Sequence, residues 1–81
     1  MDHATVSVTV NAVWDDEAAV WVATSDDVAG LAIESPTIDI LVARLKSVIP
    51  ELLAANGYTD GDELSFRLIS ELTATTARAA A

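Results

Sequence analysis

Two stretches separated by an acidic break decide the fold: TVSVTVNAV at residues 5–13 and AVWVAT at residues 19–24. The first alternates polar and apolar side chains, which is typical of a strand with one buried face. Its inward side chains should be Val6, Val8, Val10 and Ala12. The second is apolar on both faces, which is typical of a central strand. The break DDEA at residues 15–18 predicts a β-hairpin between them.

The length of the hairpin loop decides which way the second strand faces. A four-residue loop would pair Trp14 with Ala19 and Ala12 with Trp21, and would turn Trp21 toward the core. A slip of one residue would turn Trp21 to the opposite face, where it would join Ala19 and Ala23 in an apolar patch. Such a patch would mark a contact with a partner or a second copy. The sequence leaves both alternatives open.

One helix follows a third short strand at residues 31–34. Apolar side chains recur at the i, i+3, i+4, i+7 spacing over residues 38–53, which predicts a single amphipathic helix. Either Ser35 or Thr37 caps its N-terminus. The apolar stripe continues beyond Pro50, so this proline should kink the helix rather than end it. Asn56-Gly57 is a typical helix end.

The last element predicted is a fourth strand at residues 64–68, with Leu64, Phe66 and Leu68 facing inward. The order β-β-β-α-β predicts an α+β fold in which one helix packs on one face of a small, mostly antiparallel sheet. Residues 1–4 form an N-terminal extension and residues 5–69 the domain. The tail at residues 70–81 is rich in Ala and Thr, and we expect it to be frayed helix or disordered.

The charge balance narrows the choice of partners. The 81 residues contain 13 acidic and 4 basic side chains, which gives a net charge of −9. Such a chain is repelled by nucleic-acid backbones and by anionic lipid heads, so neither is an expected partner. There is no cysteine for disulfides or thiolate metal sites, and no apolar run reaches the ~20 residues of a membrane span. We expect a cytoplasmic protein without a cofactor.

The run VNAVWDDEAAVWVATSDDVAGL at residues 10–31 and the helix end Pro50-Glu51-Leu52-Leu53 resemble the HicB-like antitoxin superfamily. More narrowly, they resemble a stand-alone branch of unknown function that has no C-terminal DNA-binding module. The resemblance covers roughly residues 5–69. One departure is Asp27-Val28-Ala29-Gly30, where relatives commonly have Asp-x-Pro-Gly.

The resemblance implies a fold and a partner. The fold is a partial RNase H arrangement in which the fourth strand lies beside the first. The partner is HicA, a small basic toxin that cleaves RNA and whose active surface the HicB-like domain blocks. An acidic domain suits such a partner, because opposite charges raise the association rate and orient the encounter. Full-length HicB antitoxins bind operator DNA through an additional module. We do not expect this protein to bind operator DNA, because no such segment follows Leu68.

The candidate contact residues lie in and beside the hairpin. They are Asp15, Asp16, Glu17, Ala19, Trp21 and Ala23. We expect contacts with a basic protein or self-association into a homodimer or larger, and no catalytic or metal-ligating residue. The alternative is a small metal-dependent hydrolase or nuclease-like enzyme that uses loop carboxylates, which would need the hairpin acids and Asp26-Asp27 to converge on one ion. A further alternative is an orphan domain that only associates with itself.

Overall fold

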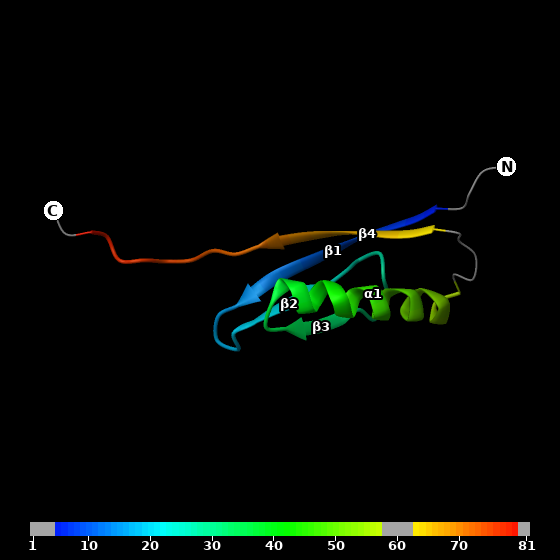
Figure 1. The fold of residues 1–81 in the computed structure, drawn as a ribbon, viewed down its shortest axis with the longest axis horizontal. Helices are drawn as coiled ribbons and strands as arrows, with labels where there is room; N and C mark the ends of the chain where they lie inside the picture. The colour runs from blue at the N-terminus through cyan, green and yellow to red at the C-terminus, as the bar shows by residue number, and fades with distance from the viewer. Residues whose placement is uncertain (1–4, 58–62, 80–81) are drawn as a thin grey trace.

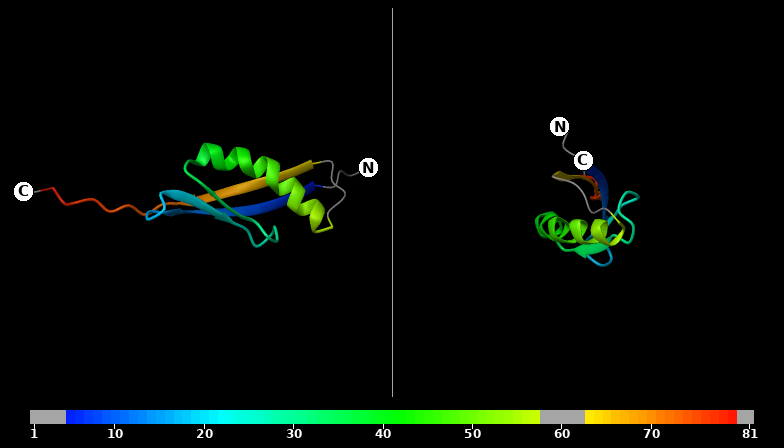
Figure 2. Two further views of the ribbon diagram at one scale, coloured as in Figure 1. Left: turned by 90° about the horizontal axis from the view of Figure 1, so that it is seen from below. Right: turned by 90° about the vertical axis from the view of Figure 1, so that its right-hand side faces the viewer.

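A computed structural model describes residues 5–57 and 63–79, and it contains one sheet and one helix (Figure 1). The helix lies on one side of the sheet (Figure 2). The elements are β1 (Thr5–Asp15), β2 (Val20–Thr24), β3 (Ala32–Ser35), α1 (Ile38–Ala55) and β4 (Glu63–Glu71). The α+β fold and the element order predicted from the sequence are therefore confirmed.

The four strands lie in the order β3-β2-β1-β4. The β1–β2 and β2–β3 pairs are antiparallel, whereas β1 and β4 run parallel, and the segment that contains α1 is long enough for the crossover that a parallel strand needs. The position of β4 beside β1 agrees with the arrangement that the family resemblance implied. The strands β1 and β2 are the two inner strands, so the prediction that the second strand is central is confirmed.

The hairpin register differs from the predicted one. Trp14 pairs with Trp21 and Ala12 pairs with Ala23, so the predicted pairing of Trp14 with Ala19 is wrong. The strand β1 continues to Asp15, which shifts the loop by one residue along the chain. The loop still has four residues, and therefore Trp21 keeps the orientation predicted for such a loop, on the same face as Ala12. The two indole rings meet edge to face, with centroids 5.4 Å apart.

Asp15 explains why the loop begins one residue later. Its Oδ1 accepts hydrogen bonds from the backbone N–H groups of Glu17 at 3.1 Å and Ala18 at 3.2 Å. This side-chain turn reverses the chain over residues 16–19 while Asp15 itself stays paired with Val20. Ala19 closes the loop at φ 56°, a left-handed conformation that non-glycine residues rarely adopt.

The helix α1 begins at the cap that Thr37 supplies, with its Oγ1 accepting from the N–H of Ile40 at 3.1 Å. It continues through Pro50 and ends at Asn56, after which Gly57 adopts φ 96°. The fully or nearly buried face of α1 consists of Leu41, Leu45, Ile49 and Leu53. Within the described residues, no helix combines the length and the apolar character needed to cross a membrane.

The core lies between α1 and the strands β1, β2 and β3. Its strand side chains include Val8, Val10 and Ala12, the inward positions predicted for β1, and Val6 packs against them. On β4 the predicted inward side chains face the helix, but their burial is incomplete. Phe66 and Leu68 are half-buried and Leu64 is exposed, because α1 packs on β2 and β3 and not squarely over β4.

The molecule is long for its mass. Its extents are 65 × 25 × 20 Å and its radius of gyration is 16.2 Å, whereas a compact chain of this length has about 12 Å. The strand β4 ends at Glu71, two residues beyond the predicted end of the domain. Residues 72–79 contain neither helix nor strand and extend away from the body, as Figure 1 shows.

Two isoleucines of α1 test how the helix packs. Ile49 is fully buried and Ile40 is 47% exposed. Ile49→Ala should lower the free energy of unfolding by about 2 to 5 kcal/mol, because it removes buried methyl groups and leaves a cavity. Ile40→Ala should change it by less than about 0.5 kcal/mol. Urea denaturation followed by circular dichroism measures both, and equal losses would contradict this placement of the helix.

Candidate functional site

The face of the sheet that points away from α1, which we call the helix-free face, carries an apolar patch. On this face Val13 pairs with Val22 of β2, and Asn11 pairs with Ile69 of β4. Val13 is 59% and Ile69 is 46% exposed, and Val20 and Val22 are partly exposed. The apolar patch therefore consists of four branched aliphatic side chains on three neighbouring strands, and it is open to solvent.

Three carboxylates and one basic side chain, Arg67, border the apolar patch on the helix-free face. Glu34 pairs with Val22, Asp15 pairs with Val20, and Glu71 lies beside Val13. All three carboxylates are exposed. A small apolar centre with a charged rim is the composition of a protein–protein interface, and the sign of this rim favours a basic partner.

The three predicted hairpin carboxylates lie at the hairpin end of the sheet. Asp15 holds the turn through the two hydrogen bonds described above. The Oδ1 of Asp16 accepts a hydrogen bond from the Nε1 of Trp14 at 3.3 Å. Asp15, Asp16 and Glu17 are all exposed. The structure therefore places these acids together in the hairpin, with Asp15 on the helix-free face and Asp16 bonded to Trp14 of the helix side, and their contact with a partner stays a prediction.

The three apolar candidates do not form a surface of their own. Trp21 is half-buried on the helix side against Trp14, and Ala23 is completely buried in the core. Ala19 lies exposed in the hairpin loop. The alternative in which Trp21, Ala19 and Ala23 share a patch on the opposite face is therefore excluded by the register. A contact role for Trp21 or Ala19 stays a prediction.

The second acidic pair, Asp26 and Asp27, lies at the opposite end of β2 from the hairpin acids. The Oδ2 of Asp27 accepts a hydrogen bond from the N–H of Thr9 at 2.8 Å. Ser25 completes this junction, because its Oγ donates to the carbonyl of Thr9 and accepts from the N–H of Asp27 at 3.0 Å. The two acidic groups therefore lie at opposite ends of the hairpin, where each accepts backbone hydrogen bonds. Among the described residues, no three His, Cys, Asp or Glu side chains gather closely enough to hold a metal ion.

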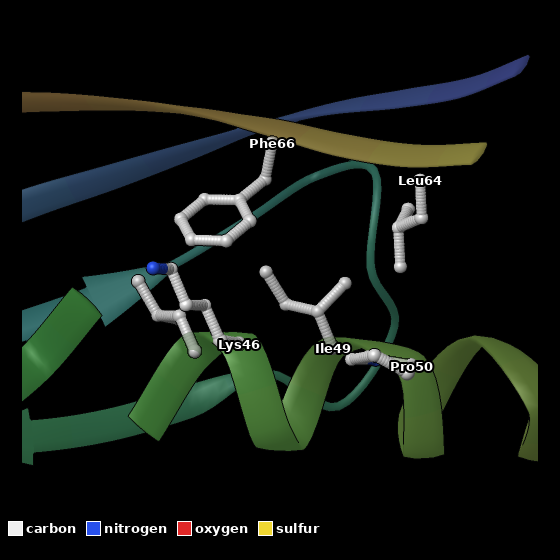
Figure 3. A pocket seen from close by; sticks show the side chains of 6 residues that line it. Lys46, Ile49, Pro50, Leu64 and Phe66 are labelled. Carbon is white, nitrogen blue, oxygen red and sulfur yellow. The ribbon is translucent and has the colours of Figure 1, made fainter. Parts of the chain in front are cut away.

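A groove between α1 and β4 was not predicted from the sequence. Its volume is about 170 Å³, and Phe66 and Leu64 face Ile49 and Pro50 across it (Figure 3). Leu45 and Lys46 complete its lining. The sequence periodicity predicted which side chains of the helix and of the strand face each other. It carried no information on how far the helix lies from the edge strand.

The contribution of the Asp27 hydrogen bond to stability can be tested by comparing substitutions of Asp27 and of its neighbour Asp26. Asp27→Ala should lower the free energy of unfolding by about 1 kcal/mol, because the N–H of Thr9 loses its acceptor. Asp26→Ala removes the same charge without touching that hydrogen bond and should be nearly neutral. Thermal unfolding of the two variants at the same pH measures the difference, and an equal effect would mean that Asp27 acts only through its charge.

Comparison with known proteins agrees with the fold. A hypothetical protein, TTHA1013 from the extremely thermophilic bacterium Thermus thermophilus, has a crystal structure that matches with a TM-score of 0.72 and 44% sequence identity. The match covers 89% of this chain and 99% of that chain. No curated protein sequence matches significantly. Residues 7–79 match the family described as a domain of unknown function, DUF1902, and the chain therefore belongs to this family.

Proposed function

We propose that this protein is a non-catalytic, HicB-like binding protein that captures a small basic protein of the HicA toxin type on its helix-free face. The observation that carries the proposal is the exposed apolar patch at Val13, Val22 and Ile69, with Glu34 and Glu71 at its rim. The position of β4 beside β1 supports the HicB-like assignment, because the sequence resemblance implied this neighbour for the fourth strand.

The proposed chemistry is electrostatic and hydrophobic. A toxin that binds RNA presents basic side chains where the phosphates lie, and the rim carboxylates would pair with those side chains in place of phosphates. The net charge of −9 would speed the encounter, and burial of the apolar patch would then slow dissociation. Blocking the RNA surface of the toxin in this way requires no reaction. Since the RNA that such a toxin cleaves is cytoplasmic, the protein would act in the cytoplasm.

The arrangement of the acids supports a binding role over the hydrolase alternative. Asp15, Asp16 and Asp27 each accept a hydrogen bond from another group of the hairpin or its junction. Their placement at opposite ends of β2 serves the fold of the hairpin, whereas metal-assisted hydrolysis needs ligands that converge on one ion.

Two variants with the same change of charge test the proposed face. Val13→Glu places a carboxylate in the apolar patch, and Ile40→Glu places one on the exposed side of α1. The probe is a small basic protein of the HicA type, taken from a gene next to this one where such a gene exists, and expressed and purified separately. We expect Val13→Glu to weaken its binding at least about tenfold and Ile40→Glu to change it less than about twofold, as for a central and a remote position of an interface.

Titration calorimetry measures these affinities, and circular dichroism confirms that both variants are folded. The affinity of the unmodified protein should fall as salt is raised, because the charged rim is screened. Equal weakening by the two glutamates, or no binding of the basic protein at all, would contradict the proposal.

A further inference from the structure

The strand β4 is an open edge. Within the described residues it has one neighbour, β1, and its nine residues, Glu63–Glu71, make it much longer than the opposite edge strand β3. No proline occurs between residues 63 and 79 to interrupt its backbone donors. Long edges of this kind are normally shortened, bulged or covered, because they pair readily with another strand. An open β4 therefore indicates a strand from another chain.

The surface area of the chain suggests how much of it such a strand would cover. The molecule exposes 6005 Å². A compact monomer of 8.5 kDa exposes about 4,700 Å². The excess of about 1,300 Å² is larger than the roughly 800 Å² that each partner buries in a standard interface. Residues 72–79, which we call the arm, are all exposed.

We propose that two copies of this chain pair antiparallel along their β4 edges, with Ile69 opposite the partner's Ile69, and that each arm crosses onto the other copy. This goes beyond the proposed function, because it concerns the open edge of β4 and needs no basic partner; Ile69 and Glu71 belong both to this edge and to the helix-free face. The two sheets would join into one, with both helices on the same side. The helix-free faces would then be continuous, and the two exposed Ile69 side chains would meet at the dimer axis.

Charge selects this register. With Ile69 at the axis, Arg67 lies opposite the partner's Glu71, and the symmetry of the dimer creates this pair twice. Arg67 and Glu71 are both on the helix-free face and both exposed. Opposite charges directly across antiparallel strands are stabilising, whereas like charges are destabilising. A register centred on Arg67 would instead place the two arginines against each other.

The same register gives the arm a binding site. Leu72 lies opposite the partner's Phe66 and Ala74 opposite the partner's Leu64. Side chains alternate between the two faces of an extended chain, so Leu72 and Ala74 point to the helix side, as Phe66 and Leu68 do. The groove between α1 and β4 is open on that side. Leu72 is 50% exposed in the single chain and would be covered there.

The arm is also complementary in charge to the body that it would cross. Residues 72–79 contain Arg78 and no acidic residue, whereas all 13 acidic residues lie elsewhere in the chain. In the single chain, Leu72 to Thr75 line a hollow with Trp14 and Asp16, and the whole arm stays exposed. A second copy would cover it.

A charge exchange tests the register. Sedimentation equilibrium of the full chain should give twice 8.5 kDa. Arg67→Glu alone and Glu71→Arg alone each place like charges across the axis, and we expect each to raise the dissociation constant at least about tenfold. The double variant Arg67→Glu/Glu71→Arg should restore the dimer. A monomeric unmodified chain, single variants without effect, or a double variant that stays dissociated would overturn the proposal.

A second pair of variants tests the arm, and circular dichroism checks that each remains folded. Leu72→Asp should dissociate the dimer, because it places a charge in the apolar groove. Thr76→Asp changes the charge equally but lies beyond the residues that face the groove, and it should leave most of the dimer intact. Equal dissociation by both, or by neither, would exclude the groove as the site of the arm. These measurements use the protein alone, so their failure is distinct from failure to bind a basic protein.

Discussion

One helix is too narrow to cover a four-stranded sheet. A helix with its side chains is about 10 to 12 Å wide, whereas four strands spaced about 4.8 Å apart span roughly 14 Å between the outer backbones and more with side chains. The helix α1 packs on β2 and β3, where its leucines and Ile49 complete the core. The constraint leaves two surfaces without a layer: the whole helix-free face, and the helix side of β4.

Both surfaces carry apolar side chains at positions set by the alternation of the strands. On the helix-free face these are Val13, Val22 and Ile69, and beside the helix they are Leu64 and Phe66. An isolated chain would keep them in water at a cost in stability, which matters for a domain that buries only about 60 to 65% of its surface. Association with a basic protein on one surface and with a second copy at the other would relieve that cost. The acidic hairpin residues have a different role in the free chain, since they hold its loop and its junction through hydrogen bonds.

Much of this structure could be predicted from the periodicity of the residues. The alternation around Val8 and Val10 identified the buried face of β1, and the helical spacing identified Leu41, Leu45 and Ile49. The hairpin pairing could not be predicted, because the side-chain turn at Asp15 moved the loop by one residue. The pairing of β4 with β1 depends on contacts between distant segments, and only the family resemblance implied that these strands are neighbours.

The site was harder to predict than the fold. Val13 belonged to a predicted strand, but its neighbours on the sheet depended on the register. Ile69 and Glu71 lay beyond the predicted end of the fourth strand at Leu68, so their place beside Val13 was missed. The alternation of Phe66 and Leu68 inward with Arg67 and Ile69 outward was the pattern that continued the strand, and it was present in the sequence.

Thiol labelling tests most directly that a single helix leaves the opposite face uncovered. The chain has no cysteine, so Val13→Cys and Val10→Cys each introduce one reactive group on the same strand. Val13 is 59% exposed on the helix-free face, and Val10 is fully buried under the helix. The cysteine at position 13 should react with a thiol reagent nearly as fast as an unfolded peptide, and the one at position 10 at least about a hundredfold more slowly, through local unfolding. Equally slow reaction at both positions would show that another layer covers the second face and would contradict the account.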